Sequence, residues 1–223
     1  MEHFRELPSG LVSCVTGRAE TAQALLQSPD TDVAAFTGGV ETGRKVNAAC
    51  AEQMMPCVVE AGGNDPMVVS KHAPMDVAIP GATTAAFHLS GQVCTSSERF
   101  FVHEDVHDEF VDGLVEMATE LRVGNGLGES EIGPLVSETA RENVAELVDD
   151  AVESGASVAC GGRVPPDRET GWFYEPTVLI DVTPDMAINR EEVFGPVAPI
   201  CEVESFEEGL AYANDTEFGL GAS

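Results

Sequence analysis

The chain has 223 residues, of which 43% are apolar, and this is enough for one large or two small domains with a hydrophobic core. Its 39 acidic and 11 basic residues give a net charge of -28, and Lys45 and Lys71 are its two lysines. Such an anionic surface repels nucleic acids and acidic membranes, which excludes both as expected partners.

The acidic residues are spread along the chain and do not form a terminal tail, which argues against a disordered acidic segment. We interpret them as an adaptation to a high-salt, halophilic interior, because concentrated salt screens the repulsion between surface charges. This interpretation predicts that the fold loosens in dilute buffer.

The cysteines and the first residues bear on the compartment. The cysteines form no C-x-x-C pair and have no zinc or disulfide spacing, and they are Cys14, Cys50, Cys57, Cys94, Cys160 and Cys201. Residues 1–4 lack the apolar run of a signal peptide, and no stretch is long enough to span a membrane. We therefore expect reduced thiols in a cytoplasmic protein.

Predicted strands and helices alternate in the first sixty residues. They are a strand over 11–15, a helix over 21–27 capped by Thr21, a strand over 32–36, a helix over 41–53 and a strand over 57–60. This alternation predicts a parallel sheet with right-handed crossovers. Gly38 and Gly39 lie at the second strand-to-helix junction, where glycines let phosphate oxygens approach backbone N–H groups, although a glycine pair also suits any tight turn.

The remaining elements predict an α/β fold with a domain boundary just past Glu60. They are a strand over 67–69, a helix from an Asp76 cap to 86 with Pro80 near its start, a strand over 99–103, a helix over 106–121, a loop over 123–134, a helix over 140–154 ended by Gly155, strands over 157–162, 174–181 and 197–204, and a helix over 206–214.

Glu60 and Cys94 are the candidate reacting residues. Glu60 ends an apolar run before a Gly-Gly turn, and Cys94 precedes Thr-Ser-Ser-Glu at 95–98, a pattern typical of the first turn of a helix. A helix N-terminus favours a thiolate. Either Cys94 is a buried small apolar residue and Glu60 is a turn acid, or Cys94 is a nucleophile whose adduct is released by water that Glu60 activates. Their spacing alone does not decide.

Four segments carry a family resemblance. Residues 59–66 and 87–94 resemble the two active-site signatures of the aldehyde dehydrogenase superfamily, in the same order and at the same separation. Residues 36–43 and 191–196 add two further motifs, and the similarity covers essentially the whole chain. The chain departs from the usual pattern at Gly39, Asn64 and Ser96, where serine, lysine and a smaller residue are common, but none of these changes removes a reacting group.

The resemblance implies a partial Rossmann-like parallel sheet followed by an α/β catalytic domain of aldehyde dehydrogenase type. Residues 1–60 would be the C-terminal part of the dinucleotide-binding domain and residues 61–223 the thiol-bearing domain, truncated at its C-terminal end. It also implies NAD or NADP as cofactor and a small aldehyde as substrate. The implied roles are nucleophile and oxyanion N–H donor for Cys94, base for Glu60, pyrophosphate contacts for Gly38 and Gly39, adenine contact for Thr42, ribose contact for Glu192 and nicotinamide contact for Phe194.

Several alternatives stay open. Glu192 and Phe194 are also typical of an acidic turn with a core phenylalanine, and Cys94 with His88 would suit a cysteine hydrolase. We expect no metal site, because His103 and His107 lack a third ligand nearby and fit surface or capping roles.

By resemblance, strands and an oxyanion-binding asparagine would precede Met1, and a return strand would follow Ser223. We therefore expect an impaired isolated chain, and either a homo-oligomer or completion by another polypeptide.

Overall fold

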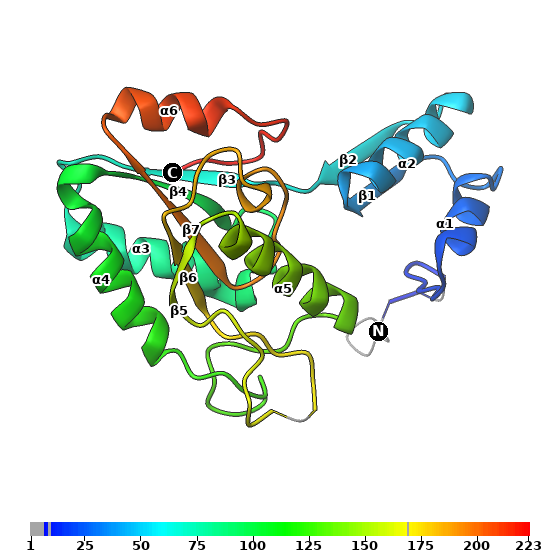
Figure 1. Cartoon of the computed structure of the whole chain (residues 1–223). Coiled ribbons are helices and arrows are strands. Elements are labelled where there is room, and N and C mark those ends of the chain that lie inside the picture. The colour runs from blue at the N-terminus through cyan, green and yellow to red at the C-terminus, as the bar shows by residue number, and fades with distance from the viewer. Residues whose placement is uncertain (1–6, 9, 169) are drawn as a thin grey trace. The chain divides into compact units, whose positions relative to one another are not determined.

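A computed structural model of the chain describes residues 7–8, 10–168 and 170–223. The chain divides into two compact units, Met1–Ala61 and Gly62–Ser223. Each unit has its own β-sheet, as Figure 1 shows.

The first unit is a strand–helix–strand arrangement preceded by a short helix. Its elements are α1 (Ala19–Leu26), β1 (Ala34–Gly38), α2 (Val40–Glu52) and β2 (Cys57–Ala61). β1 and β2 pair in parallel, from Ala34 opposite Cys57 to Gly38 opposite Ala61. The parallel pairing predicted from the alternation is therefore confirmed.

Two predictions for the first unit are wrong. Residues 11–15 form no strand, and Leu11 and Val15 are 63% and 62% exposed, because no strand of the described chain pairs with this segment and an unpaired strand leaves its backbone polar groups without partners. Thr21 does not cap the first helix, since α1 begins at Ala19 with Arg18 as the N-cap and Thr21 lies in the first turn.

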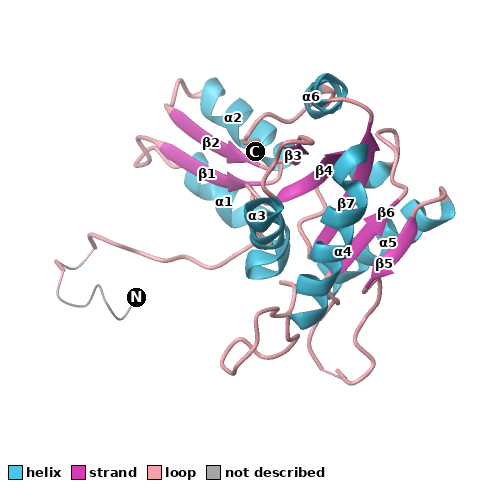
Figure 2. Cartoon of the chain, turned by 90° about the vertical axis from the view of Figure 1, so that its left-hand side faces the viewer, coloured by secondary structure: helices cyan, strands magenta, loops and turns pink. Residues whose placement is uncertain are grey.

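The second unit is built on a five-stranded sheet with the order β3-β4-β7-β6-β5 (Figure 2). Its elements are β3 (Asp65–Val69), α3 (Met75–Phe87), the 3-10 helix η2 (His88–Gly91), β4 (Ser97–His103), α4 (Glu104–Glu120), α5 (Glu138–Glu153), β5 (Ser157–Cys160), β6 (Thr177–Ile180), the 3-10 helix η3 (Ala187–Asn189), β7 (Val197–Val203) and α6 (Phe206–Asn214). β3, β4, β7 and β6 run parallel, and β5 pairs antiparallel with β6.

Helices cover both faces of this sheet. Phe100 and Val102 of β4 join a core with residues of α3 and α4, whereas Phe101 packs near Tyr212 of α6, with ring centroids 5.9 Å apart. Figure 1 accordingly shows α6 on the opposite side of the strands from α3 and α4. On the α6 side, Val144 and Val148 of α5 pack with β6 and β7 in a further core. The chain is thus the mixed α/β fold that the sequence predicts.

The predicted helix start at residues 95–98 is wrong. β4 begins at Ser97 and is buried along its whole length, because it lies between β3 and β7. The Ser/Thr/Glu pattern favours a helix cap locally, but a strand buried by neighbours on both sides overrides that propensity.

Smaller differences concern helix ends. Pro74 is the N-cap of α3, so Asp76 lies in its first turn and does not cap it, and Pro80 lies inside the helix. His103 caps α4, where its Nδ1 accepts a hydrogen bond of 3.1 Å from the Asp105 N–H, which confirms a capping role for this histidine. The helix over 206–214 is confirmed as α6, while β5 ends at Cys160 and β6 starts only at Thr177.

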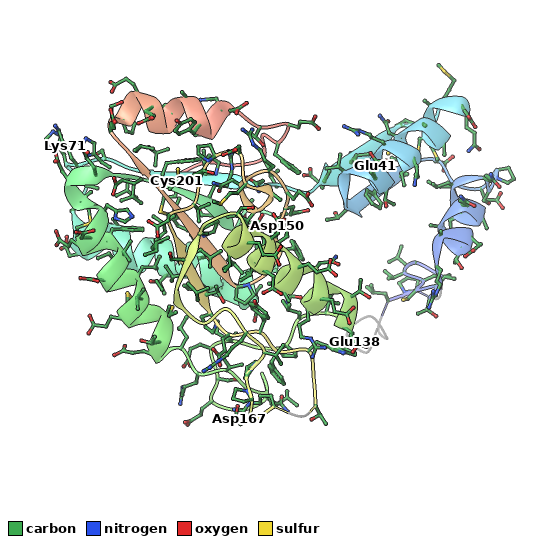
Figure 3. All side chains as sticks on the ribbon, viewed as in Figure 1. Glu41, Lys71, Glu138, Asp150, Asp167 and Cys201 are labelled. Carbon is green, nitrogen blue, oxygen red and sulfur yellow. The ribbon has the colours of Figure 1, made fainter. Side chains whose placement is uncertain are left out.

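Charge differs between the units. Gly62–Ser223 holds 31 acidic and seven basic residues, against eight acidic and four basic residues in Met1–Ala61. Glu138 and Asp150 of α5 and Asp167 of the loop between β5 and β6 are exposed members of this acidic set (Figure 3). A search of the described helices for a membrane-spanning segment finds none that is sufficiently long and apolar.

Candidate active site

The first-unit candidates gather at the carboxyl ends of β1 and β2. Gly38 is the last residue of β1, Gly39 is the N-cap of α2, and Glu60 pairs with Thr37 across the sheet. Both strands point the same way, so the glycine turn and the exposed Glu60 share one edge. Ligands of open parallel sheets bind outside this edge.

The N-terminus of α2 is open to solvent at this edge. Gly39 has φ -66°, and a Cβ there would meet nothing within 4 Å. Among the described residues no side chain caps this helix of 13 residues, and the Glu41 carboxylate in its first turn is engaged by Arg44 at 2.9 Å. Thr42 is exposed in the same turn. The positive end of the helix dipole and its free N–H groups can therefore receive an anion.

Cys94 lies at the corner of a turn, where the Ser96 N–H donates to the Val93 carbonyl at 2.9 Å. Its side chain is exposed. The turn leads into β4 and not into a helix, so the predicted stabilisation of a thiolate by a helix N-terminus is wrong.

The residues before Cys94 hold a strained conformation. Leu89, Ser90 and Gly91 have φ values of 50°, 61° and 70°, all in the left-handed region. The Ser90 hydroxyl donates to the Gly133 carbonyl at 3.0 Å, and a Cβ on Gly91 would overlap the carbonyl of Gly195. Such strain persists only where the surroundings hold it, and it is typical of functional sites.

Gln92 is a supporting residue that the sequence analysis missed. Its Oε1 accepts a hydrogen bond of 2.8 Å from the Val136 N–H, and its Nε2 donates to the Pro134 carbonyl at 3.3 Å. The segment before Cys94 is thereby tied to residues 134–136. No local pattern identifies this role, because the partners lie 44 and 42 residues further along the chain.

Gly62 and Gly63 bring Cys94 and Glu192 together. A Cβ on Gly63 would overlap the Cys94 carbonyl oxygen, and a Cβ on Gly62 would overlap the Glu192 carboxylate. The Gly63 N–H donates to Glu192 Oε1 at 3.1 Å. Burial raises the pKa of Glu192, and the charge of Asp65 raises it further, while the Gly63 hydrogen bond opposes both effects.

Phe194 follows in the same turn with φ 48°, a left-handed conformation that is unusual for a bulky residue, and its side chain is 39% exposed. Its N–H donates to Glu98 Oε1 at 2.7 Å, and the Val193 N–H donates to Glu98 Oε2 at 2.8 Å. Burial raises the pKa of Glu98 to about 8, although the two N–H groups lower it. Sequence reasoning placed Glu98 in a helix and missed this contact.

Arg99 is a second supporting residue that the sequence does not reveal. Its guanidinium is buried and donates to the carbonyls of Asn64 at 2.8 Å, Tyr212 at 3.1 Å and Ala213 at 3.0 Å. It joins the last turn of α6 to the start of β3, where the Asn64 side chain also donates to the Glu191 carbonyl at 2.6 Å. Within the second unit, Cys94, Glu192 and Phe194 thus lie near the amino ends of parallel strands, on turns that hold one another.

The described residues contain no group of three or more His, Cys, Asp or Glu side chains that could hold a metal ion. His88 and Cys94 are both exposed, and no hydrogen bond joins them in the part of the chain that the structure describes.

Comparisons with known proteins agree with these motifs. The model of the aldehyde dehydrogenase family matches residues 1–223. A succinate-semialdehyde dehydrogenase (NADP+) of Mycobacterium avium is 40% identical over 97% of the chain, and a betaine aldehyde dehydrogenase of Brucella anthropi is 40% identical over 99%. The crystal structure of succinate-semialdehyde dehydrogenase from Burkholderia pseudomallei matches 97% of the chain with a TM-score of 0.93 and 38% identity.

The chain spans less than half the length of these relatives, 46% of the two curated proteins and 45% of the solved structure. Because the family model covers every residue from 1 to 223, the chain belongs to the aldehyde dehydrogenase family.

Proposed function

We propose that this chain takes part in the NAD(P)-dependent oxidation of an aldehyde to a carboxylic acid, with Cys94 as nucleophile and Glu60 as general base. The observation that carries the proposal is the interlocked arrangement of the Cys94 turn, Gly63 and Glu192, which fits family membership and exposes the thiol. The relatives are named for aldehyde oxidation, and one of them for NADP+.

The reaction begins when the Cys94 thiolate adds to the carbonyl carbon of the aldehyde and forms a thiohemiacetal. By the family resemblance, the Cys94 backbone N–H would donate to the developing oxyanion. When bound, the nicotinamide would accept the hydride that leaves the carbon attached to Cys94, and with loss of the hydroxyl proton that carbon would reach the oxidation level of a thioester. Glu60 would then take a proton from water, the resulting hydroxide would attack the thioester carbon, and the Cys94 thiolate would leave as the carboxylic acid forms; Glu60 would pass its proton to solvent.

The residues present suit a nicotinamide dinucleotide. The open N-terminus of α2 at Gly39 fits a pyrophosphate, with Gly38 beside it and Thr42 toward the adenine. Glu192 keeps acceptor capacity beyond its bond to Gly63 for ribose hydroxyls, and the exposed part of the Phe194 ring fits a flat nicotinamide. We assign residues 1–60 to the cofactor-binding part and residues 61–223 to the thiol-bearing part, which would add Glu192 and Phe194 to the cofactor contacts.

The test is a dehydrogenase assay on the full 223-residue chain in high salt. NAD and NADP are each combined with succinate semialdehyde and betaine aldehyde, and formation of reduced nicotinamide is followed by absorbance. Cys94→Ala is expected to abolish turnover and to leave cofactor binding unchanged. Cys14→Ala is the matched control, because Cys14 is also exposed but has no proposed role. Normal activity in Cys94→Ala would falsify the assignment.

A second candidate is a chain that needs another polypeptide, or a second copy, to turn over substrate. It is favoured by the chain's coverage of only 46% of its relatives. Under this candidate another polypeptide supplies part of the site, and losing one oxyanion donor typically costs about 3 kcal/mol of transition-state stabilisation. Under this candidate the wild type shows no turnover, yet added cofactor protects Cys94 from alkylation.

A further inference from the structure

Glu98 is a buried carboxylate that the proposed chemistry does not use. It is the second residue of β4, four positions after Cys94, and its side chain is 3% exposed. The hydrogen bonds found for it in the described chain come from two consecutive backbone N–H groups, those of Val193 and Phe194. Arg99, its neighbour in sequence, donates instead to three backbone carbonyls.

Burying this carboxylate is costly for the fold. A buried charge without a cationic partner loses its hydration, and two charge-assisted hydrogen bonds offset only part of that loss. Negative neighbours add to the cost, because the charges of Glu192 and Asp65 raise the pKa of Glu98 further. With its pKa raised to about 8, Glu98 can avoid this cost near neutral pH by binding a proton, so its burial is best explained by the two backbone N–H groups that donate to its two oxygens.

Those N–H groups belong to a strained turn. Phe194 has φ 48°, and a left-handed conformation costs a bulky L-residue roughly 1–3 kcal/mol, so it needs a fixed partner to persist. Glu98 accepts hydrogen bonds from this turn and lies on β4, the strand that directly follows the Cys94 turn. The other side of the turn is held where the Glu192 carboxylate accepts from Gly63, which itself lies against the Cys94 carbonyl.

We propose that Glu98 is a positioning residue that locks the strained Val193–Phe194 turn onto the Cys94 segment and thereby fixes how Glu192 and Phe194 are presented to the cofactor. The inference rests on the proposed function for the identity of that ligand, but the lock itself is a property of the second unit alone. Glu98 touches no reacting atom in this account.

The first test measures the lock without substrate or cofactor. Hydrogen exchange of the amides in 191–196 is compared in the wild-type chain and Glu98→Gln at a pH well above 8, since burial raises the pKa of Glu98 to about 8 and the ionised form is the one that accepts both hydrogen bonds. Loss of a hydrogen bond to a charged group predicts about a 10- to 100-fold faster exchange at Val193 and Phe194. Glu116→Gln, on the exposed face of α4, is expected to change nothing there. Unchanged exchange in Glu98→Gln overturns the proposal.

A double-mutant cycle separates positioning from simple burial. Glycine adopts a positive φ without strain, so in a Phe194→Gly background Glu98→Gln should accelerate exchange at Val193 much less than in the wild type. Leu89→Gly is the control background, because Leu89 is also left-handed but has no contact with Glu98 among the described hydrogen bonds. Equal effects in all three backgrounds would show that Glu98 acts through packing and would overturn the proposal.

If Glu98→Gln does not fold, hydrogen exchange of the wild-type chain and of Glu98→Asp still tests the proposal. Wild-type amides of Val193 and Phe194 that exchange as freely as an unprotected amide contradict the lock outright. Glu98→Asp retains the charge and should restore part of the protection. In an active preparation, Glu98→Gln should raise the KM for cofactor more than it lowers kcat. If every variant is inactive but the amides exchange as predicted, the result counts against the proposed function and not against the positioning role of Glu98.

Discussion

The Gly38–Gly39 turn of the first unit and the Gly62–Gly63 turn of the second use the same pair of residues for different purposes. A Cβ on Gly38 would overlap the Phe36 ring, but a Cβ on Gly39 would stand in open space, so the Gly39 side of that turn leaves backbone N–H groups free for a ligand. A Cβ on Gly62 or Gly63 would overlap the Glu192 carboxylate or the Cys94 carbonyl. The second glycine pair therefore serves close internal packing, and a glycine motif alone does not distinguish the two uses.

The contrast extends to the surrounding groups. At the carboxyl edge of β1 and β2 the candidate residues are exposed and lightly bonded, so substitutions there should change chemistry more than stability. Around Cys94 the backbone groups are engaged by Ser90, Gln92 and Glu98, so substitutions there should change stability as well. The following predictions test this division.

The largest effect is expected for Glu60→Gln. A general base typically contributes 10²- to 10⁴-fold, so release of the acyl group from Cys94 should slow by about that factor. Stability should not change, because Glu60 is exposed. Rapid-mixing kinetics of an active preparation should show a burst of reduced cofactor followed by a slow phase.

Glu52→Gln is the matched control, an exposed glutamate at the end of α2 in the same unit. Undiminished steady turnover without a burst in Glu60→Gln would remove Glu60 from the mechanism.

The same substitution at the two turns compares them directly. Gly63→Ser forces its Cβ against the Cys94 carbonyl, and such overpacking typically costs about 1–3 kcal/mol of unfolding free energy. Gly39→Ser places a good N-cap residue in open space, so its effect should be neutral or stabilising by a few tenths of a kcal/mol. Urea unfolding of both variants measures the difference, and equal costs would contradict the proposed distinction.

Local patterns explain what could be predicted from the sequence. The β1-α2-β2 unit and the α6 helix follow from periodicity and turn residues within short windows, and the structure confirms them. The start of β4 was misjudged because its burial depends on β3 and β7, which lie far away in sequence. Glu98 and Arg99 were missed for the same reason, since their partners are 95 to 114 residues away except for Asn64 at 35.

The candidate residues divide in the same way. Cys94, Glu192 and Phe194 were found through motifs, but the strained backbone at Leu89–Gly91 and Phe194 leaves no trace in composition, because only tertiary contacts stabilise it. In the sequence, Gly91 is the one sign of this left-handed backbone. The reason for a glycine there is the carbonyl of Gly195, which comes from a turn far away in sequence and would overlap a Cβ.

Salt should affect the two units unequally. The second unit holds 31 acidic against seven basic residues and the first only eight against four, so self-repulsion is greater in the second. The screening length falls from about 10 Å at 0.1 M to about 3 Å at 1 M salt, which should raise the Tm of the second unit more.

Calorimetry in dilute and in multimolar sodium chloride measures this effect. The triple variant Glu138→Gln, Asp150→Asn, Asp167→Asn removes three exposed charges and should flatten the salt dependence (Figure 3). A Tm that does not rise with salt would contradict the halophilic interpretation.

A modest effect is expected for Leu89→Gly, with the opposite sign to most substitutions beside a core. Leu89 is 62% exposed, so little apolar burial is lost, while its φ of 50° costs an L-residue about 1–2 kcal/mol. Glycine removes this strain, but the greater conformational entropy of the unfolded chain costs about 0.5–1 kcal/mol, so a net gain of up to about 1.5 kcal/mol remains.

Leu127→Gly is the control for Leu89→Gly. Leu127 is 97% exposed and is not among the left-handed residues of the described chain, so the same substitution there brings only the entropic cost and should destabilise the fold slightly. Urea unfolding of the two variants should therefore give shifts of opposite sign. If Leu89→Gly is destabilising to the same extent as Leu127→Gly, the left-handed segment before Cys94 stores no strain. That result would weaken the contrast between the tightly held turns of the second unit and the open Gly39 turn of the first.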